Sequence, residues 1–452
     1  MSERSDPMRR LLMVTYHFPP VGGGVERTLK HVTYLPRHGW QPVVVAPSNS
    51  AYRIIDPGSV ARIPEGVEVH RSPTVEPAHV RRAIRSVVRR RPPGGPPSNG
   101  GGAAPAAASR SVSTRLRSRA NAAWSVLVPK LFFPDEQLLW IPGAVVAGER
   151  AHRRSPVDAV YSSAPPVSGH LAAAVLAHLL DLPWIADFRD PWIGNAFAAP
   201  LPALHRALQR RFEREIVERA GRVVFATSTW RDRYVRRYPH LEDRFVHIPN
   251  GYDPKDLGVD RRRGRGPEEA FRLIYAGSIY GDRELDLFLD GLALALERDP
   301  SLRERLRVEF VGWLSARNLP TANARRGAFE PIVSFAGFRP RSEVLAMERS
   351  ADAGLILIAD DPGRDADVNA KLYEYLGLDL PVLAVAPSGE TRATLEELGW
   401  GVGADPRPEA IADGLAAIMA LPRPDRRADP AGRYDRRMLS ERLAGLLEEL
   451  SG

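Results

Sequence analysis

Short apolar runs recur along the whole chain, and a segment with helical periodicity follows most of them. The runs do not alternate with polar residues, which is typical of strands buried on both faces of a parallel sheet. In the first half the expected strands are residues 11–16, 42–46, 67–71, 157–162, 184–188, 223–228 and 245–249. In the second half they are residues 273–277, 308–312, 333–337, 354–359 and 382–386.

Helices are expected between these strands. Within residues 25–35, for example, Val25, Leu29, Val32 and Leu35 fall on one helical face. Strand–helix alternation predicts α/β architecture with right-handed crossovers. The pattern occurs twice, and the two sets meet at a charged, aperiodic stretch. We therefore predict an N-terminal Rossmann-like domain over residues 1–253, a linker over 254–270 and a second Rossmann-like domain over 271–430. A C-terminal helix over 431–452 completes the chain.

Positive charge is concentrated in one segment. The net charge is +8, yet residues 81–130 contain ten arginines, one lysine and no acidic residue, so the remainder is slightly acidic. Residues 91–110 are rich in Pro, Gly, Ala and Ser and are expected to be disordered. A basic amphipathic stretch precedes them and an aromatic stretch follows, which favours contact with an anionic membrane surface. A solvated basic loop is the alternative. Nucleic acid is not an expected partner, because no nucleic-acid-binding motif accompanies the charge.

Composition excludes several chemistries. There is no cysteine, so disulfides, zinc–thiolate sites, iron–sulfur clusters and thiol catalysis are excluded. The eleven histidines include no His-x-x-x-His pair, so no metal site is expected. No apolar stretch approaches the roughly 18 to 20 residues of a membrane span. The N-terminus does not have the pattern of a signal peptide. We expect a cytoplasmic protein, with any peripheral attachment on the inner face of the cell membrane.

Two motifs follow expected strands. Gly22, Gly23 and Gly24 separate the first strand from the helix after it, where backbone N–H groups can approach a phosphate. A flexible turn is the alternative. The strand over 184–188 ends in a charged group, Asp187, Arg189 and Asp190. Ligands of open α/β sheets bind at such carboxyl ends. A local salt bridge of Arg189 is the alternative.

A third motif lies at residues 365–376. Lys371 and Glu374 share one face of a helix expected to begin near Val368. A lysine can neutralise a pyrophosphate, and a carboxylate can accept two ribose hydroxyls. The alternative is a surface ion pair that contributes little stability. Asp365 and Asp367 form an Asp-x-Asp pattern and are expected to cap the start of this helix.

These motifs occur together with PNGYD at 249–253, LIYAG at 273–277 and KLYEYLGLDLPV at 371–382. FPDEQ at 133–137, SSAPP at 162–166 and WIADFRDPW at 184–192 accompany them. In this combination the chain resembles retaining glycosyltransferases of family four, most closely the bacterial surface-polysaccharide type. The resemblance implies a GT-B fold, with two Rossmann-like domains facing an interdomain cleft. It implies retaining, metal-independent transfer from a nucleoside-diphosphate sugar to a hydroxyl acceptor, either soluble or lipid-linked, in glycan, polysaccharide or glycolipid biosynthesis. No cofactor is implied.

The resemblance also implies roles for residues. Lys371 and Arg283, after the Gly277 loop, would bind the diphosphate, and Glu374 the ribose. Arg189 and Asp190 occupy the place of a His-Asp pair near the reacting sugar. Asp187, Asn250 and the three glycines would complete the substrate site. Ala366 stands where the family has its first motif Glu, so Asp365 or Asp367 is the candidate replacement.

Two alternatives remain at this point. A sugar-nucleotide 2-epimerase shares the fold, although residues 371–374 do not match its usual pattern. The replacement at Ala366 is also compatible with an inactive homologue that binds a nucleotide sugar.

Overall fold

The computed structural model describes residues 8–21, 24–52, 55–82, 131–194, 201–258, 269–279, 284–315, 318–422 and 427–452. Three predictions lie wholly or largely outside these ranges: the disordered stretch 91–110, the membrane-contacting segment 81–130, and the roles of Gly22, Gly23 and Arg283.

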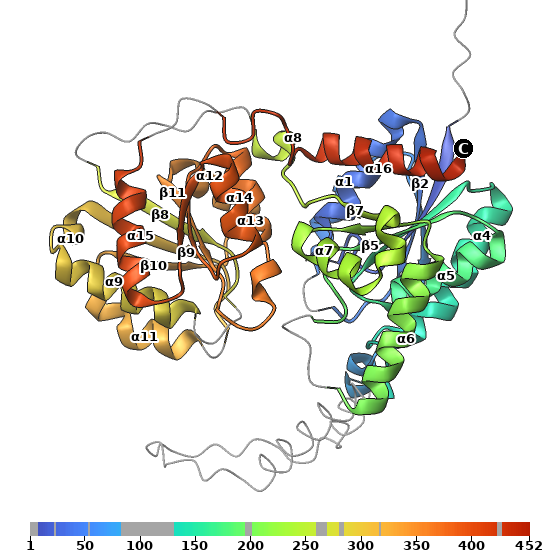
Figure 1. Cartoon of the computed structure of the whole chain (residues 1–452), viewed down its shortest axis with the longest axis horizontal. Coiled ribbons are helices and arrows are strands. Elements are labelled where there is room, and N and C mark those ends of the chain that lie inside the picture. The colour runs from blue at the N-terminus through green and yellow to red at the C-terminus, as the bar shows by residue number, and fades with distance from the viewer. Residues whose placement is uncertain are drawn as a thin grey trace, which may run out of the picture.

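Two parallel sheets form the two lobes seen in Figure 1. The N-terminal sheet has seven strands in the order β3-β2-β1-β4-β5-β6-β7. They are β1 (Arg9–Thr15), β2 (Trp40–Pro47), β3 (Glu68–Ser72), β4 (Ala159–Ala164), β5 (Trp184–Phe188), β6 (Arg222–Phe225) and β7 (Phe245–His247). The C-terminal sheet has six strands in the order β10-β9-β8-β11-β12-β13. They are β8 (Phe271–Ala276), β9 (Leu306–Val311), β10 (Val333–Gly337), β11 (Ala353–Leu357), β12 (Val382–Val385) and β13 (Gly401–Ala404).

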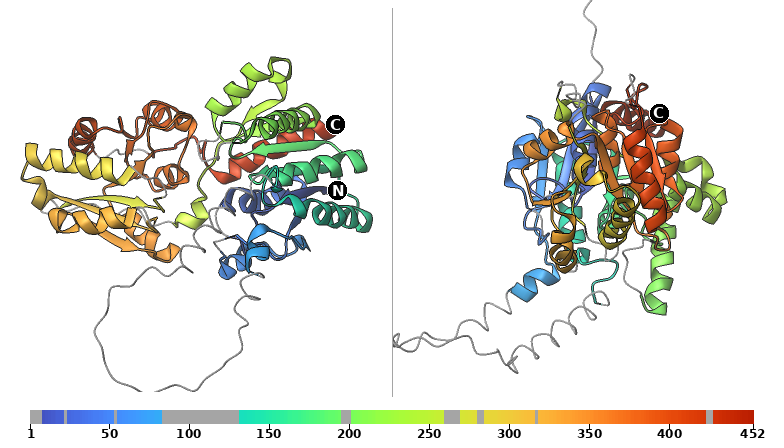
Figure 2. Two further views of the ribbon diagram at one scale, coloured as in Figure 1. Left: turned by 90° about the horizontal axis from the view of Figure 1, so that it is seen from below. Right: turned by 90° about the vertical axis from the view of Figure 1, so that its left-hand side faces the viewer.

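Helices cover both faces of each sheet (Figures 1 and 2). Those within the N-terminal part are α1 (Glu26–Tyr34), α4 (Ile141–Arg154), α5 (Ser168–Leu180), α6 (Ala203–Arg219), α7 (Ser228–Arg237) and α8 (Pro254–Leu257). The others are α9 (Glu284–Arg298), α10 (Leu302–Arg305), α11 (Asn318–Phe329), α12 (Arg341–Ser350), α13 (Ala370–Gly377), α14 (Glu390–Leu398), α15 (Pro408–Ala420) and α16 (Arg436–Ser451). Short 3₁₀ turns are η1 (Leu35–His38), η2 (Pro57–Arg62), η3 (Leu138–Trp140), η4 (Pro239–Arg244) and η5 (Arg364–Ala366).

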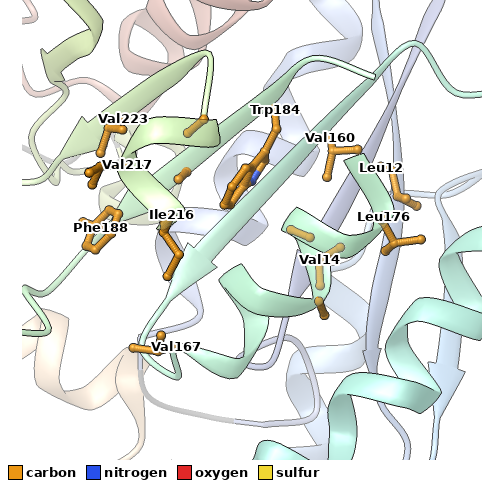
Figure 3. Close-up of a cluster of buried hydrophobic side chains, with 14 of the residues drawn as sticks. Leu12, Val14, Val160, Val167, Leu176, Trp184, Phe188, Ile216, Val217 and Val223 are labelled. Carbon is orange, nitrogen blue, oxygen red and sulfur yellow. The ribbon is translucent and has the colours of Figure 1, made fainter. Parts of the chain in front are cut away.

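Burial of both sheet faces explains the unbroken apolar runs. In β1, Leu12 and Val14 belong to the core cluster shown in Figure 3, together with Trp184 of β5. Leu11 and Met13, one residue out of phase, belong to the cluster on the opposite face. Successive residues of a strand point to opposite faces, so every position must be apolar when both faces are covered. The predicted α/β class with two Rossmann-like units is confirmed.

Helix α16 returns to the N-terminal lobe, although it follows the C-terminal sheet in sequence (Figure 1). Its Leu439, Leu443 and Leu447 share a core cluster with residues of β1 and β2. His31 Nδ1 of α1 lies 3.0 Å from Ser440 Oγ of α16. The lobes are therefore joined by two passages of the chain, one after β7 and one before α16.

Polar contacts also join the lobes directly. The Glu390 carboxylate at the start of α14 accepts hydrogen bonds from the backbone N–H groups of Ser228 and Thr229, both at 2.9 Å. Their hydroxyls donate to the same carboxylate. An anion at the N-terminus of α7 satisfies helix N–H groups that otherwise lack partners. Arg233 of α7 pairs with Asp365 at 2.6 Å. In the described ranges, no helix is long and apolar enough to cross a membrane.

Candidate functional site

A cavity of about 440 Å³ lies between the two lobes; we call it the cleft. Each sheet reverses its strand order beside its first strand, at β1/β4 and at β8/β11. Residues at the carboxyl ends of β8 and β11 line the cleft, and those at the carboxyl ends of β1 and β4 line a cavity that adjoins it. Such points are the usual ligand sites of open α/β sheets. Six of the predicted site residues line the cleft: Arg189, Asp190, Asn250, Gly277, Asp367 and Lys371. Thr227, Ser278, Glu284, Arg364 and Asn369 also line it and had not been predicted.

Arg189 lies directly after β5 and is held by backbone atoms. Its Nη1 donates to the carbonyl of Gly24 at 2.6 Å, and its Nη2 to that of Pro165 at 3.4 Å. Its Nε lies 3.5 Å from the carboxylate of Asp190. The local salt bridge and the cleft position are thus both present. Gly24 has a φ of +66°, and a Cβ there would lie 2.3 Å from Nη1 of Arg189. A side chain at position 24 would therefore displace the Arg189 guanidinium, and the left-handed backbone there favours glycine.

Asp187 is not placed to contact a ligand, which corrects its prediction as a substrate-binding residue. Its side chain is fully buried, and both oxygens bond to Arg27 of α1 at 2.7 and 3.0 Å. The Tyr161 hydroxyl donates to the same carboxylate at 2.5 Å. Burial would raise the pKa of Asp187, but the charge and hydrogen bonds of Arg27 hold it below its ordinary value. This ion pair ties α1 to the sheet beneath the cleft.

Lys371 and Glu374 form a partly buried cluster and not a surface pair. The Lys371 ammonium lies 2.6 Å from Glu374 and 3.2 Å from Glu348 of α12. Arg341 approaches the other Glu374 oxygen at 3.0 Å. Burial and the neighbouring Glu374 raise the pKa of Glu348 to about 7. Burial would lower the pKa of Lys371, but the two carboxylates raise it, so Lys371 remains a cation at the cleft wall.

Glu374 lies behind Lys371 and does not itself line the cleft cavity. Neither Glu348 nor Arg341 had been predicted. Both lie on a helix that is distant in sequence from α13, and no local motif marks them.

The helix cap was predicted wrongly. Helix α13 begins at Ala370, and the Asn369 side chain caps it by accepting from the Lys371 N–H at 3.0 Å. Asp365 and Asp367 lie in and directly after the short turn η5 instead. Asp365 is paired with Arg233 of the other lobe.

Asp367 faces the cleft beside a second buried cation. Arg364 pairs with Asp367 at 2.9 Å and with Glu284 at 3.1 Å. Burial and the negative charge of Asp190 raise the pKa of Asp367 to about 6, although Arg364 opposes the shift. Ala366 is buried and places no carboxylate in the cleft.

Two further cavities adjoin the cleft. One, of about 620 Å³, is the N-terminal pocket and shares Arg189, Asp190 and Pro191 with the cleft. Gly24 lines this pocket. The other, of about 340 Å³, is the C-terminal pocket; it shares Gly277 with the cleft. Its walls are mainly apolar and aromatic: Phe310, Trp313, Leu314, Leu319, Phe335 and Phe338. The three cavities are therefore neighbours across the two lobes, with the cleft between the other two.

The sequence has partial relatives among known proteins. Residues 103–256 match the sequence model of the family described as Glycosyltransferase Family 4. A D-inositol 3-phosphate glycosyltransferase from Geodermatophilus obscurus is 31% identical over 221 residues, which are 46% of this chain and 47% of that protein. The chain thus spans about half the length of the curated relatives that it matches.

Solved structures match over nearly the full length. A glycosyltransferase from Rickettsia africae has a TM-score of 0.60 at 12% identity, covering 99% of each chain. Anabaena Alr3699/HepE, solved in complex with UDP, has a TM-score of 0.60 at 14% identity, covering 98% of this chain and 100% of that one. The chain has the GT-B fold. The fold implied by the sequence resemblance is thereby confirmed.

Proposed function

We propose that this chain transfers a sugar from a nucleoside-diphosphate sugar to a hydroxyl acceptor. The observation that carries the proposal is the series of three cavities at the carboxyl ends of both sheets. An aromatic pocket suits a nucleobase, a cation-lined cleft suits a diphosphate and sugar, and a polar pocket beside them suits an acceptor. The family match and the glycosyltransferases of the same fold support this assignment.

The diphosphate would lie beside Lys371 and the start of α13. Lys371 and Arg364 supply positive charge there, and the first N–H groups of a helix favour an anion. Glu374 lies 2.6 Å from Lys371 and would accept hydrogen bonds from the ribose hydroxyls only after Lys371 moves toward the diphosphate, because its carboxylate does not line the cleft. Gly277, shared by the cleft and the C-terminal pocket, lets backbone approach the nucleotide closely.

Transfer requires stabilisation of the leaving diphosphate and of an oxocarbenium-like sugar. Lys371 and Arg364 would serve the first need without a metal ion. Asp190 and Asp367 face the cleft from opposite lobes and would lie near the positive charge that develops on the sugar. We favour retention by a front-face displacement in which the leaving phosphate accepts the proton of the acceptor hydroxyl. Closure of the lobes would exclude water, whose attack competes with transfer.

The decisive experiment incubates the full chain with a panel of nucleoside-diphosphate sugars and follows the products by mass spectrometry, with and without EDTA. Transfer, or slow release of free sugar, supports the proposal. An isomerised donor would indicate an epimerase, and binding without turnover would indicate an inactive homologue, for which Ala366 gives a reason. Loss of activity in EDTA, restored by magnesium or manganese, would contradict metal independence.

Variants at the cleft make the assay specific. Lys371→Ala and Glu374→Ala should each reduce donor use at least tenfold, or about 1.4 kcal/mol. Lys255→Ala is a matched control, because Lys255 is an exposed lysine of α8 that does not line the cleft. Equal activity in all three variants would remove this site from the proposal.

The proposed acceptor belongs to a glycan, polysaccharide or glycolipid pathway, and residues 81–130 would attach the protein to an anionic membrane. The charge of that segment supports the idea, since each basic residue contributes roughly 1 kcal/mol near such a surface. Deletion of the segment should release the protein from anionic vesicles at low salt. Equal co-sedimentation of both proteins would contradict attachment through these residues.

A further inference from the structure

The N-terminal pocket lies where an acceptor must bind if the proposed function holds. It shares Arg189, Asp190 and Pro191 with the cleft, so a molecule inside it adjoins the donor site. Its other walls come from the ends of β1 and β4 and from residues 134–137. The chemistry of these walls determines which acceptor can enter.

The charges of the pocket do not suit a phosphate. Among the described residues that line it, Arg189 is the one arginine or lysine. Its guanidinium already donates to the carbonyls of Gly24 and Pro165 and lies beside Asp190. Asp190 and Asp135 place two carboxyl groups in the same walls. A phosphate here would meet the Asp190 carboxylate and a single cation that already faces that carboxylate and two backbone carbonyls, so the cost of removing the phosphate from water is poorly compensated.

The Asp135 carboxyl group is itself held in place. It accepts from the Ser168 N–H at 2.9 Å, from the Ser168 hydroxyl at 2.5 Å and from the Gln137 N–H at 3.0 Å. Burial nevertheless raises the pKa of Asp135. Asp135 therefore shapes the pocket wall rather than providing a free charge.

His17 presents a polar atom without a partner. The residue is 8% exposed, and its Nδ1 is buried with no hydrogen-bond partner in the part of the chain that the structure describes. Burial and the charge of Arg189 lower the pKa of His17 to about 3, so the imidazole is neutral. His17 lines the N-terminal pocket, and a sugar hydroxyl both donates and accepts, so it can pair with an imidazole nitrogen in either tautomer once the ring turns toward the ligand.

Aromatic rings surround His17. The Tyr52 ring stands edge-on to the imidazole at 4.7 Å, and Phe188 and Trp192 line the pocket farther along. Such rings offer apolar area to the C–H face of a sugar, while a few polar atoms fix its orientation.

From these observations we propose that the N-terminal pocket accepts an uncharged sugar ring that carries no phosphate, and that His17 hydrogen-bonds one of its hydroxyls. The inference rests on the proposed function. It names the acceptor class, and it makes His17 a residue that determines specificity. A phosphate elsewhere on a larger acceptor, outside this pocket, is compatible with it.

The test compares matched probes that differ in one phosphate: myo-inositol with D-inositol 3-phosphate, and methyl glucoside with its 6-phosphate. Saturation-transfer NMR on the full chain measures their binding in the presence of UDP. We expect both neutral probes to bind at least tenfold more tightly than their phosphorylated partners. Tighter binding of either phosphorylated probe, or binding of none, would overturn the proposal.

Two variants test the role of His17. His17→Leu should lose at least tenfold in neutral-probe affinity, and His17→Asn should retain most of it, because its amide places a polar atom near the position of Nδ1. If His17→Leu fails to fold, the wild-type imidazole resonances of His17 provide the second measurement. They should shift on addition of myo-inositol, and unchanged resonances would contradict the contact.

UDP binding, measured separately by calorimetry in wild type and His17→Asn, distinguishes failure of the acceptor proposal from failure of the proposed function. Loss of neutral-probe binding with UDP binding intact affects only the acceptor inference. Absence of UDP, GDP and ADP binding in the wild type would instead contradict the proposed function.

Discussion

Replacing Arg27 by methionine should destabilise the N-terminal lobe by at least about 3 kcal/mol. The side chains of Arg27 and Asp187 are 2% and 0% exposed, and two bonds of 2.7 and 3.0 Å join them. Removal of one member of a buried ion pair typically costs about 3–5 kcal/mol, because the other charge is left unpaired. Arg27 also donates to the carbonyls of Ile248 and Pro249 at 2.9 and 2.8 Å. Each carbonyl left unsatisfied costs about 1–3 kcal/mol further, unless water enters.

Urea unfolding followed by tryptophan fluorescence measures this loss. Only Trp313 and Trp400 of the eight tryptophans lie in the C-terminal half, so the signal reports mainly on the N-terminal lobe. Arg27→Met combined with Asp187→Leu should recover about 1–3 kcal/mol of the loss, since the two residues are directly coupled. If the losses of unfolding free energy in the two single variants simply added in the double variant, the reasoning would be refuted.

The pH dependence of the same pair has a defined sign. The folded-state pKa of Asp187 lies below its ordinary 3.8, since Arg27 outweighs the opposing effect of burial. Its contribution to the free energy of unfolding is therefore fully present above about pH 4 and is lost as the pH falls through the lowered pKa.

Asp190→Asn is the matched control for Asp187→Asn. The Asp190 side chain is 52% exposed, so its replacement should change stability by no more than about 0.5 kcal/mol while reducing transfer. Asp187→Asn should do the reverse and destabilise the lobe. If Asp187→Asn reduced transfer with stability unchanged, Asp187 would be a substrate ligand after all.

Three other predictions follow from buried contacts. The free energy of unfolding should fall as the pH rises from about 4.5 to 7, because the folded-state pKa of Glu348 is raised to about 7. Glu348→Gln should remove this pH dependence, and urea midpoints measured at pH 5 and pH 8 test it. Gly24→Ala should lose activity because its Cβ would displace Arg189, whereas Gly39→Ala, with a φ of +78° and no atom within 4 Å, should cost only stability; equal activities would refute the steric argument. Glu390→Ala should separate the lobes and increase the radius of gyration in X-ray scattering, and an unchanged value would show that this carboxylate does not hold them together.

The sequence was sufficient to predict the architecture, because the positions of the strands and helices depend on local patterns of apolar and polar residues. Short runs rich in apolar or β-branched residues identified every strand of the N-terminal sheet and all but one of the C-terminal sheet. The exception is β13, whose four residues Gly401–Ala404 include only one large apolar side chain, Val402. Backbone pairing with β12 makes this segment a strand, although its own composition does not favour one.

The sequence was less informative where a residue depends on a distant partner. Arg27 occupies a polar position in an amphipathic helix, and nothing near it indicates that Asp187, far along the chain, will neutralise it. Glu348 likewise pairs with Lys371 on another helix, and no residue near Glu348 in sequence indicates that contact. Asn369 was overlooked as a cap because the Asp-x-Asp pattern before it has the same local preference. Motifs that follow strands placed four residues in the cleft, Arg189, Asp190, Asn250 and Gly277, because strand order brings the carboxyl ends of the strands together. Asp367 and Lys371 reach the cleft from the turn η5 and the helix α13 instead.

The central claim is that the cleft binds the diphosphate of a sugar donor through Lys371. Isothermal titration calorimetry of the full chain with UDP, GDP and ADP tests it most directly, with Lys371→Ala and the control Lys255→Ala measured beside the wild type. The account predicts that at least one nucleotide binds, that Lys371→Ala weakens it tenfold or more, and that Lys255→Ala does not. Unaltered affinity in Lys371→Ala, or no binding of any of the three nucleotides to the wild type, would contradict it.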